Sequence, residues 1–445
     1  MGEKQFNLAK MTWPIFVELM LQLLVGNMDQ IMLSYYNDTA VASVGNANQV
    51  ISMVIITFST ITLAATILIS RFLGARREDL VKKVYSLGFY LNLVLGIIFA
   101  TLVYFSASSV LSLMKIDSSI LMEASSYLKI VGISMVFQAL IMTFTAFLRA
   151  NAHMKESMIL TLVMNIVNVI LNYTFIFGKF NIPEMGTSGA AVATLVSRVI
   201  GSIAIFIIFM KVVDNATISF KNIKPFPKGI LSDILAIGVP SGGEALSYNL
   251  SQTVGLTFIN TFGVYAATTR TYVYIFSNLC YLFALAVAQA GQVFISYLVG
   301  RGNIEKAEKQ TYKILKLSIP VSVAVAILIH IFSTPLFKIF TTNPEILNLA
   351  KKVTLVGVFV ELGRSCNIVL VRTLQAVGDV KYTVIIGVIF QWIIGVGLAY
   401  ILGVYMNLGL VGIWMAYAVD EGIRAIIFLI RFKRGRWKYN HYLSS

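Results

Sequence analysis

Residues 14–29 read PIFVELMLQLLVGNMD, an apolar run that contains one proline and two carboxylic acids. The rest of the chain is equally apolar, because 58% of its 445 residues are hydrophobic and only 12% are charged. A soluble domain typically has about 45–50% apolar and about 25% charged residues. The composition therefore predicts an integral membrane protein, in which two carboxylates inside one apolar segment need an explanation.

Apolar windows long enough to cross a membrane recur along the whole chain. A helix needs about 20 residues to span the hydrocarbon core of a bilayer, whereas a barrel strand needs about half as many, with alternating polarity. The windows have the helical length and lack that alternation. We therefore predict an all-α polytopic membrane protein with twelve transmembrane helices, at residues 11–35, 47–70, 84–108, 124–147, 157–178, 188–210, 234–261, 271–297, 314–334, 350–371, 382–404 and 408–430.

The basic residues indicate how these helices are oriented, because cytoplasmic loops carry an excess of Lys and Arg. Of the 35 Lys and Arg residues, 25 lie in the two termini and every second loop, six in the alternate loops and four within spans. This asymmetry predicts a multi-pass protein of the plasma membrane with both termini cytoplasmic. It also accounts for the net charge of +15, which in a soluble chain would suggest nucleic acid as a partner.

The second half of the chain repeats the first at an offset of 226 residues, which becomes 223 near the end. The matching pairs are Pro14 and Pro240, Glu18 and Glu244, Ala40 and Ala266, Ser70 and Ser296, Gly74 and Gly300, Leu148 and Leu374, Gly186 and Gly409, and Gly189 and Gly412. An even number of helices per repeat predicts two six-helix bundles of the same topology, related by a pseudo-two-fold axis along the membrane normal. This is a transporter architecture. We predict the bundles at 1–212 and 234–445, joined by a cytoplasmic linker at 213–233.

Six acidic residues fall inside the predicted spans: Glu18, Asp29, Glu244, Glu361, Asp420 and Glu421. An ionisable residue inside a membrane is costly, and by default it suggests a functional site. Local spacing offers two of them a structural alternative, because Asp420 can pair with Arg424 at i, i+4 and Glu361 with Arg364 at i, i+3. For these residues, a role in the transport pathway and simple charge neutralisation stay equally open.

Glu18 and Glu244 occupy equivalent places in the two repeats, four residues after Pro14 and Pro240 respectively. A proline removes one backbone hydrogen bond and kinks its helix. A symmetric pair of glutamates could attract cations to the transport pathway, or it could stabilise the kinked backbone. Tyr248, on the same predicted span, is open to the same two interpretations, a place in the substrate pathway or ordinary helix packing.

Asp29 has neither a local partner nor a repeat equivalent. No Lys or Arg lies within one helical turn of it, and the matching position in the second repeat is Gly255. A carboxylate in such a place can exchange a proton or a sodium ion for a change in packing. The segment 165–172, NIVNVILN, places Asn168 and Asn172 on one helix face. Their amide oxygens could complete a small cation site, or they could serve only to hydrogen-bond neighbouring helices.

Motifs of enzymes are missing from the sequence. It contains no P-loop lysine motif, no HExxH and no CxxC. We therefore expect a transporter and not an enzyme, with no cofactor other than H⁺ or Na⁺ as the coupling ion and no metal site beyond Na⁺ at Asp29.

Several segments together resemble the multidrug and toxic compound extrusion (MATE) family. The similarity extends over essentially the whole chain, and its strength lies in the combination of segments. They are the opening pattern Pro14-x3-Glu18-x10-Asp29, TAVASVGNANQ at 39–49, ISRFLGARRED at 69–79, LRANAHMK at 148–155, GTSGAAVAT at 186–194, ISYLVGRGNIEKAEK at 295–309 and LQAVGDVK at 374–381.

The resemblance implies a bacterial antiporter that exports cationic amphiphilic compounds in exchange for H⁺ or Na⁺ by alternating access, acting as a monomer within the bilayer. In the branch similar to DNA-damage-inducible transporters, an aspartate of the first span carries the coupling ion, and a proline bends its helix. Asp29 and Pro14 occupy these places. A threonine of the sixth span, which also belongs to this ion site, falls on Thr194.

Two departures from the family pattern leave the coupling ion open. The fifth-span pair of an asparagine and an acid falls on Asn168 and Asn172, so the acid is replaced by an amide. Other members use a glutamate of the seventh span at the place of Tyr248, so that carboxylate is missing and Glu244 is at most a displaced substitute. The alternative function is a lipid-linked oligosaccharide flippase of the same superfamily, for which a cationic cavity would be expected in place of this acid-rich interior.

Overall fold

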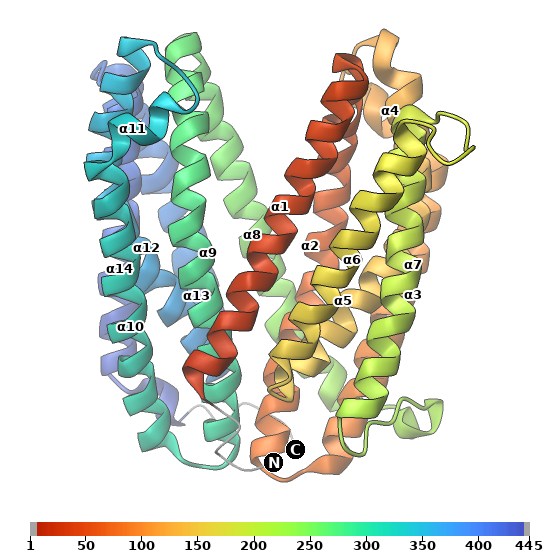
Figure 1. Cartoon of the computed structure of the whole chain (residues 1–445). Helices are drawn as coiled ribbons and strands as arrows, with labels where there is room; N and C mark the ends of the chain where they lie inside the picture. The colour runs from red at the N-terminus through yellow and green to blue at the C-terminus, as the bar shows by residue number, and fades with distance from the viewer. Residues whose placement is uncertain (1–6, 440–445) are drawn as a thin grey trace. The chain divides into compact units, whose positions relative to one another are not determined.

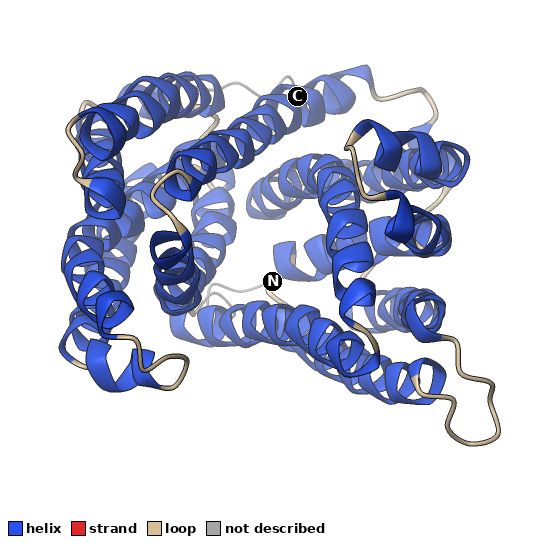
Figure 2. Cartoon of the chain, turned by 90° about the horizontal axis from the view of Figure 1, so that it is seen from above, coloured by secondary structure: helices blue, strands red, loops and turns tan. Residues whose placement is uncertain are grey.

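The computed structural model describes residues 7–439, so the chain ends at 1–6 and 440–445, whose cytoplasmic location the sequence predicts, lie outside the described residues. Every regular element of the described part is a helix, which confirms the predicted all-α fold (Figures 1 and 2). The chain divides into two units after Gly238.

The first unit contains seven α-helices and a short 3₁₀ helix. They are α1 (Leu8–Tyr36), α2 (Asp38–Gly74), α3 (Glu78–Leu113), α4 (Ser118–Ile133), α5 (Met135–Ala150), α6 (Met154–Ile176), α7 (Gly186–Val212) and η2 (Phe220–Ile223). The predicted span 124–147 is divided between α4 and α5, which are bent by 46° at Ser134. The Ser134 hydroxyl donates to the Val131 carbonyl at 2.6 Å and accepts from Nη1 of Arg198 at 2.7 Å, so side-chain bonds take part at the bend.

The second unit takes up the rest of α8 and the helices that follow it. They are α8 (Lys228–Asn260), α9 (Val264–Gly300), α10 (Ile304–Ile331), α11 (Ser333–Lys338), α12 (Pro344–Ala376), α13 (Val380–Phe390), η3 (Gln391–Leu398), η4 (Tyr400–Tyr405), α14 (Gly409–Lys433) and η5 (Arg436–Tyr439). The predicted span 382–404 begins as α13 and continues through the π-helical segments η3 and η4. π-Helical turns are rare and often lie at functional sites.

Nine helices of the described chain are long and apolar enough to cross a membrane, and the bent pair of α4 and α5 makes a tenth. The two further predicted spans correspond to α8 and α14. Both are long enough to span, at 33 and 25 residues. They fall outside the apolar set because α8 is rich in Gly, Ser and Asn, and because α14 carries Asp420, Glu421 and Arg424 along its length.

Short polar residues set where several helices begin. Asn37 ends α1 and caps α2, because its side-chain oxygen accepts the Thr39 amide at 3.1 Å. Asp117 caps α4 in the same way, with the Ser119 amide at 2.8 Å. The hydrogen bond from the Ser119 backbone lowers the pKa of Asp117, which lies in a loop outside the spans. The ionised carboxylate also suits the positive end of the helix dipole.

The predicted linker 213–233 packs against the first unit. The Ser86 hydroxyl of α3 accepts from the Ser219 amide at 3.2 Å and from the Asn222 side chain at 3.0 Å. Phe220 meets Tyr90 edge to face with ring centroids 5.7 Å apart. The last part of the predicted linker is helical, because α8 begins at Lys228, and this helix belongs to the first unit up to Gly238.

Each unit has an apolar core of its own. In the first unit the core includes fully buried Phe58 of α2 and Leu128 of α4. In the second unit it includes fully buried Phe337 of α11, Val353 of α12 and Ile413 of α14. Packing within each unit therefore holds the helices that carry the polar groups described below.

The repeated glycines have the same two roles in both halves. Gly186 and Gly409 begin α7 and α14 with φ of +54° and +58°, a left-handed conformation that favours glycine. A Cβ atom on Gly189 would lie 2.6 Å from the Phe175 carbonyl oxygen. A Cβ atom on Gly412 would lie 2.7 Å from the carbonyl oxygen of Leu402 in η4. The left-handed backbone therefore explains the first glycine of each pair, and the close approach of a neighbouring helix explains the second.

Replacing Gly189 by Ala should lower the stability of the first unit by about 1–3 kcal/mol, because the added methyl group is forced against a backbone carbonyl. Thermal unfolding in detergent measures this as a lower apparent melting temperature. The matched control is Gly45→Ala in α2, where a Cβ meets nothing within 4 Å. We expect Gly45→Ala to be neutral or slightly stabilising, and equal losses for both variants would contradict the packing argument.

Candidate functional site

Helix α1 packs mainly against α6 (Figure 1). Asp29 of α1 is hydrogen-bonded to a residue of α6. The side-chain nitrogen of Asn172 donates to Oδ1 of Asp29 at 2.5 Å and to Oδ1 of Asn168 at 3.1 Å. Asn168 and Asn172 are buried, and Asp29 is half-buried. The structure therefore brings these three predicted site residues together.

The polar groups around Asp29 include an acceptor with no partner. Oδ1 of Asn172 is buried and accepts no hydrogen bond among the described residues. A buried amide oxygen normally has a donor, so an unpartnered one calls for an explanation. The carboxylate of Asp29 and the side-chain oxygens of Asn168 and Asn172 lie in one group. Oxygen ligands of this kind suit a hard cation such as Na⁺.

Arg198 is the basic residue associated with this group. It lies on α7, and it interacts electrostatically with Asp29 and with Tyr127 of α4. Its guanidinium donates to Ser134 at the α4–α5 bend, and no ion pair within 4 Å joins it to Asp29 in the described chain. Local spacing in the sequence offers Arg198 no partner, because Ser134 lies 64 residues away, at the break between α4 and α5.

Thr194, the fourth predicted residue of the ion site, is half-buried on α7. Among the described residues it forms no hydrogen bond with Asp29, Asn168 or Asn172. The structure thus does not join Thr194 to the group around Asp29.

Glu18 is neutralised inside the first unit by a residue that sequence reasoning missed. One of its oxygens lies 2.9 Å from Nη2 of Arg149, and the glutamate is only 1% exposed. Glu18 also accepts from Ser157 at 2.9 Å and from Thr161 at 3.5 Å. Arg149 comes from the end of α5, in a stretch that we counted as a cytoplasmic loop. Pro14, one turn earlier, is buried within α1, which continues through it as one helix.

Glu244 differs from Glu18 although the two residues are repeat equivalents. It is half-buried on α8, and in the described chain it forms no hydrogen bond and no ion pair within 4 Å. Gly387 leaves room for it, because a Cβ there would lie 2.7 Å from Oε1 of Glu244. The two glutamates therefore differ in their local chemistry. The reason is that Gln375, a neutral residue, stands at the repeat position of Arg149.

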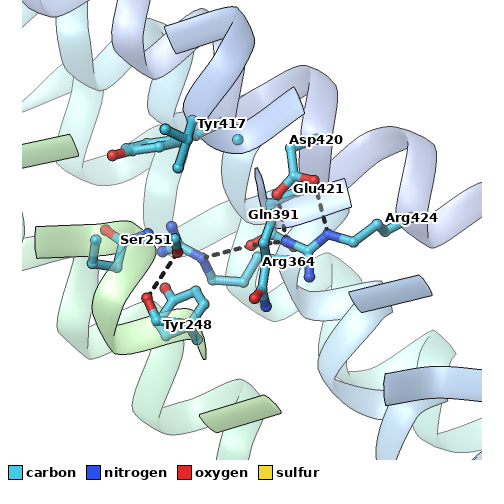
Figure 3. Close-up of a pocket in the computed structure, with 11 residues that line it drawn as sticks. Tyr248, Ser251, Arg364, Gln391, Tyr417, Asp420, Glu421 and Arg424 are labelled. Carbon is cyan, nitrogen blue, oxygen red and sulfur yellow. Dashed lines mark hydrogen bonds and ion pairs between the residues drawn. The ribbon is translucent and has the colours of Figure 1, made fainter. Parts of the chain in front are cut away.

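The second unit contains a cluster of buried charges on α12 and α14 (Figure 3). Arg364 lies 2.6 Å from Glu361, and Arg424 lies 2.6 Å from Asp420, which confirms both pairs expected from the spacing. Glu421 joins the two pairs, at 3.2 Å from Arg424 and 3.7 Å from Arg364. Three carboxylates against two guanidinium groups leave the cluster with a formal charge of −1.

This cluster borders a small cavity that Tyr248 of α8 and Gln391 of η3 also line (Figure 3). The cavity measures about 20 Å³, enough for a water molecule or a monovalent cation but far below the size of a drug site. Oε1 of Gln391 and Oε2 of Glu361 are buried without a hydrogen-bond partner among the described residues. Of the predicted pathway residues, Tyr248 lines this cavity, whereas Glu361 does not line it and is joined to it through Arg364.

The MatE family model matches the chain twice, at residues 14–174 and at 240–401. The chain belongs to the MATE family of transporters. Both matches begin at the prolines of the repeat, Pro14 and Pro240. Relatives include the "Uncharacterized transporter YisQ" of Bacillus subtilis, 36% identical over 98% of this chain and 96% of the relative. A "Probable multidrug resistance protein NorM" of Thermotoga maritima is 28% identical over 97% and 93%.

Solved structures share the fold of this transporter. A MOP superfamily transporter from Pyrococcus furiosus superposes with a TM-score of 0.89 at 21% identity, covering 98% of both chains. A MATE structure described as the straight conformation gives a TM-score of 0.90 at 22% identity, again over 98% of both chains. At these identities the likeness establishes the fold alone.

Replacing Arg424 by Ala should destabilise the second unit by about 3–5 kcal/mol, because buried Asp420 loses its charge partner and Glu421 keeps only the more distant Arg364. Thermal unfolding of the detergent-solubilised transporter measures the change. The control is Lys309→Ala, which removes an ion pair with Glu305 whose side chains are 71% and 80% exposed. Exposed pairs contribute little, so this variant should melt like the wild type. A stable Arg424→Ala variant would contradict the need for charge pairing in the cluster.

Proposed function

We propose that this MATE transporter is an antiporter that exports cationic amphiphilic compounds in exchange for H⁺ or Na⁺. The multidrug resistance names of its NorM relatives support the export of drugs. We further propose the branch similar to DNA-damage-inducible transporters, with action as a monomer in a bacterial plasma membrane and with both termini cytoplasmic.

One observation carries the coupling part of this proposal. In the first unit, Glu18 is neutralised by an arginine 2.9 Å away, but Asp29 has only an amide donor within hydrogen-bond distance among the described residues. A buried carboxylate without a charge partner is costly, and its charge is the one that an arriving cation can neutralise. Asp29 is therefore our candidate carrier, with Asn168 and Asn172 supplying oxygen ligands.

Binding must favour one conformation if the ion is to drive transport, because an ion that binds both states equally shifts nothing. A proton on Asp29, or Na⁺ between Asp29 and the amide oxygens, changes the bond that Asn172 donates to the carboxylate. That bond links α1 to α6. Its change frees the outer half of α1 to bend, and Pro14, whose ring removes one backbone hydrogen bond, is the weak point of the helix.

We assign attraction of the cationic substrate to acidic groups of the second unit. Glu244 lacks an ion pair in the described chain, and the buried cluster near Tyr248 and Glu361 has a formal charge of −1. Aromatic faces such as that of Tyr248 also attract cations. The acidic balance disfavours the alternative, a lipid-linked oligosaccharide flippase, because a pyrophosphate group requires cationic partners.

The energy of one proton is sufficient for modest export. A pH step of one unit corresponds to about 1.4 kcal/mol. If a monovalent cation leaves as one proton enters, charge movement cancels and the membrane potential contributes nothing. The pH step alone then supports an approximately tenfold concentration gradient of the exported compound.

The Asp29→Asn variant should lose coupled transport while it retains the fold, since an amide can still hydrogen-bond Asn172. The wild type and the variant are reconstituted in proteoliposomes, and efflux of a fluorescent cation such as ethidium is followed under a pH gradient alone and then a sodium gradient alone. With the wild type, we expect one of the two gradients to drive an approximately tenfold concentration difference of the fluorescent cation across the membrane. With the variant, we expect neither gradient to drive any.

The matched control is Asp117→Asn, the same substitution at an exposed helix cap of the first unit, which should transport like the wild type. Retention of coupled efflux by Asp29→Asn would overturn the assignment of the ion site. A wild type that responds to neither gradient would instead favour the flippase.

A further inference from the structure

Five polar side chains form a continuous stripe along one face of α6. Their spacing of four, four, three and four residues keeps them on the side that faces α1. They are Ser157, Thr161, Asn165, Asn168 and Asn172. We call this set the α6 polar stripe.

Hydrogen bonds join the α6 polar stripe to α1 along its length. At the cytoplasmic end, Ser157 and Thr161 donate to the two oxygens of Glu18, at 2.9 Å and 3.5 Å. In the middle, Asn165 donates to the Leu21 carbonyl at 3.0 Å. At the outer end, the Asn172 amide contacts Asp29. The two carboxylates of α1, about 16 Å apart along the helix, are thus the two ends of one polar line.

Between Met158 and Leu171 the residues of α6 outside the stripe are all apolar, so the α6 polar stripe is not part of a solvated face. Large hydrophobic residues on its other faces are exposed on the first unit, as expected of a helix in contact with lipid. They are Ile159, Leu162, Val163, Ile166 and Ile170. By contrast Ser157 and Asn172 are fully buried. Polar groups at every turn of a lipid-facing helix are costly unless they have a use.

We propose that the α6 polar stripe is the route along which the coupling cation moves between Asp29 and the cytoplasmic end of the first unit, with Glu18 as the second carboxylate that receives it. This inference rests on the proposed coupling function of Asp29. It gives Glu18 a part in ion movement in place of the substrate pathway.

The chemistry of the stripe suits either ion. For H⁺, the O–H bond on Asp29 breaks and a new O–H bond forms on Glu18, with the hydroxyl groups of Thr161 and Ser157 and intervening water relaying the proton. For Na⁺, the carboxylate, hydroxyl and amide oxygens are successive ligands. In both cases the positive charge of Arg149, 2.9 Å from Glu18, repels the arriving cation. The cation therefore dissociates quickly from Glu18.

The plain structural alternative is that the stripe only fastens α1 to α6. The two interpretations differ in what a break in the stripe does. A fastening role affects every transport mode, because the helices then pack poorly. A conducting role affects only the mode that moves the ion, and leaves exchange of drug for drug unchanged because that exchange needs no net ion movement.

Two variants interrupt the stripe without disturbing Asp29. Asn165→Leu removes the middle amide and introduces no charge. Glu18→Gln combined with Arg149→Gln removes the receiving carboxylate together with its partner, so that no unpaired charge stays buried. We expect each variant to lower gradient-driven efflux from proteoliposomes at least tenfold, and to keep drug counterflow exchange within twofold of the wild type.

Matched controls lie elsewhere in the first unit. Glu123→Gln changes a carboxylate that also accepts two hydroxyl groups, Ser43 at 3.0 Å and Thr187 at 2.8 Å. Asn46→Leu changes an asparagine that donates to the Ala42 carbonyl of its own helix. Both controls should keep gradient-driven efflux and counterflow within twofold of the wild type.

The outcomes separate this inference from the function on which it rests. Gradient-driven efflux that stays within twofold of the wild type in both stripe variants would overturn the route, and so would parallel losses of efflux and counterflow. Wild-type protein that responds to neither a pH nor a sodium gradient would instead overturn the coupling function itself. Entrapped pyranine, which reports proton movement directly, distinguishes the two ions in the variants.

Discussion

The cost of holding a charge in a medium of low dielectric organises the polar interior of this transporter. Four of the six acids in the predicted spans have an arginine partner in the described chain. Glu18 lies against Arg149, Arg198 donates to Ser134, and the acids of α12 and α14 share two arginines. Some of these contacts join different helices, as between Glu18 and Arg149, whereas the pairs at i, i+3 and i, i+4 neutralise charge within one helix.

Against this background the exceptions are informative. In the described residues Asp29 and Glu244 are acids of predicted spans with no ion pair within 4 Å. One lies in each unit, on the first helix of each repeat. The fold neutralises the four span acids that are buried and has left these two half-buried acids available. We regard this as the reason to place ion coupling at one and attraction of a cationic substrate at the other.

The two repeats share backbone features, but they differ in their charged side chains. Glycines with positive φ begin the last long helix of each half, and a second glycine three residues later allows close helix approach in both. The side chains that carry charge do not repeat. Gly255 stands at the place of Asp29, and Gln375 at the place of Arg149. Backbone constraints are needed twice for two bundles to fold, whereas an ion site is needed once.

The sequence by itself determined the helical membrane fold, the duplication and the ion pairs inside one helix. Hydrophobic length, an offset of 226 residues and the spacing of Glu361 with Arg364 or Asp420 with Arg424 are all local or periodic signals. Only the tertiary structure decided that Asn172 hydrogen-bonds Asp29, whereas Thr194 forms no hydrogen bond with it among the described residues, and that Glu18 is neutralised. The residues of these contacts are more than 100 positions apart, and their meeting depends on how far each helix is rotated and shifted against its neighbour. Periodicity does not encode that rotation, because packing between helices sets it.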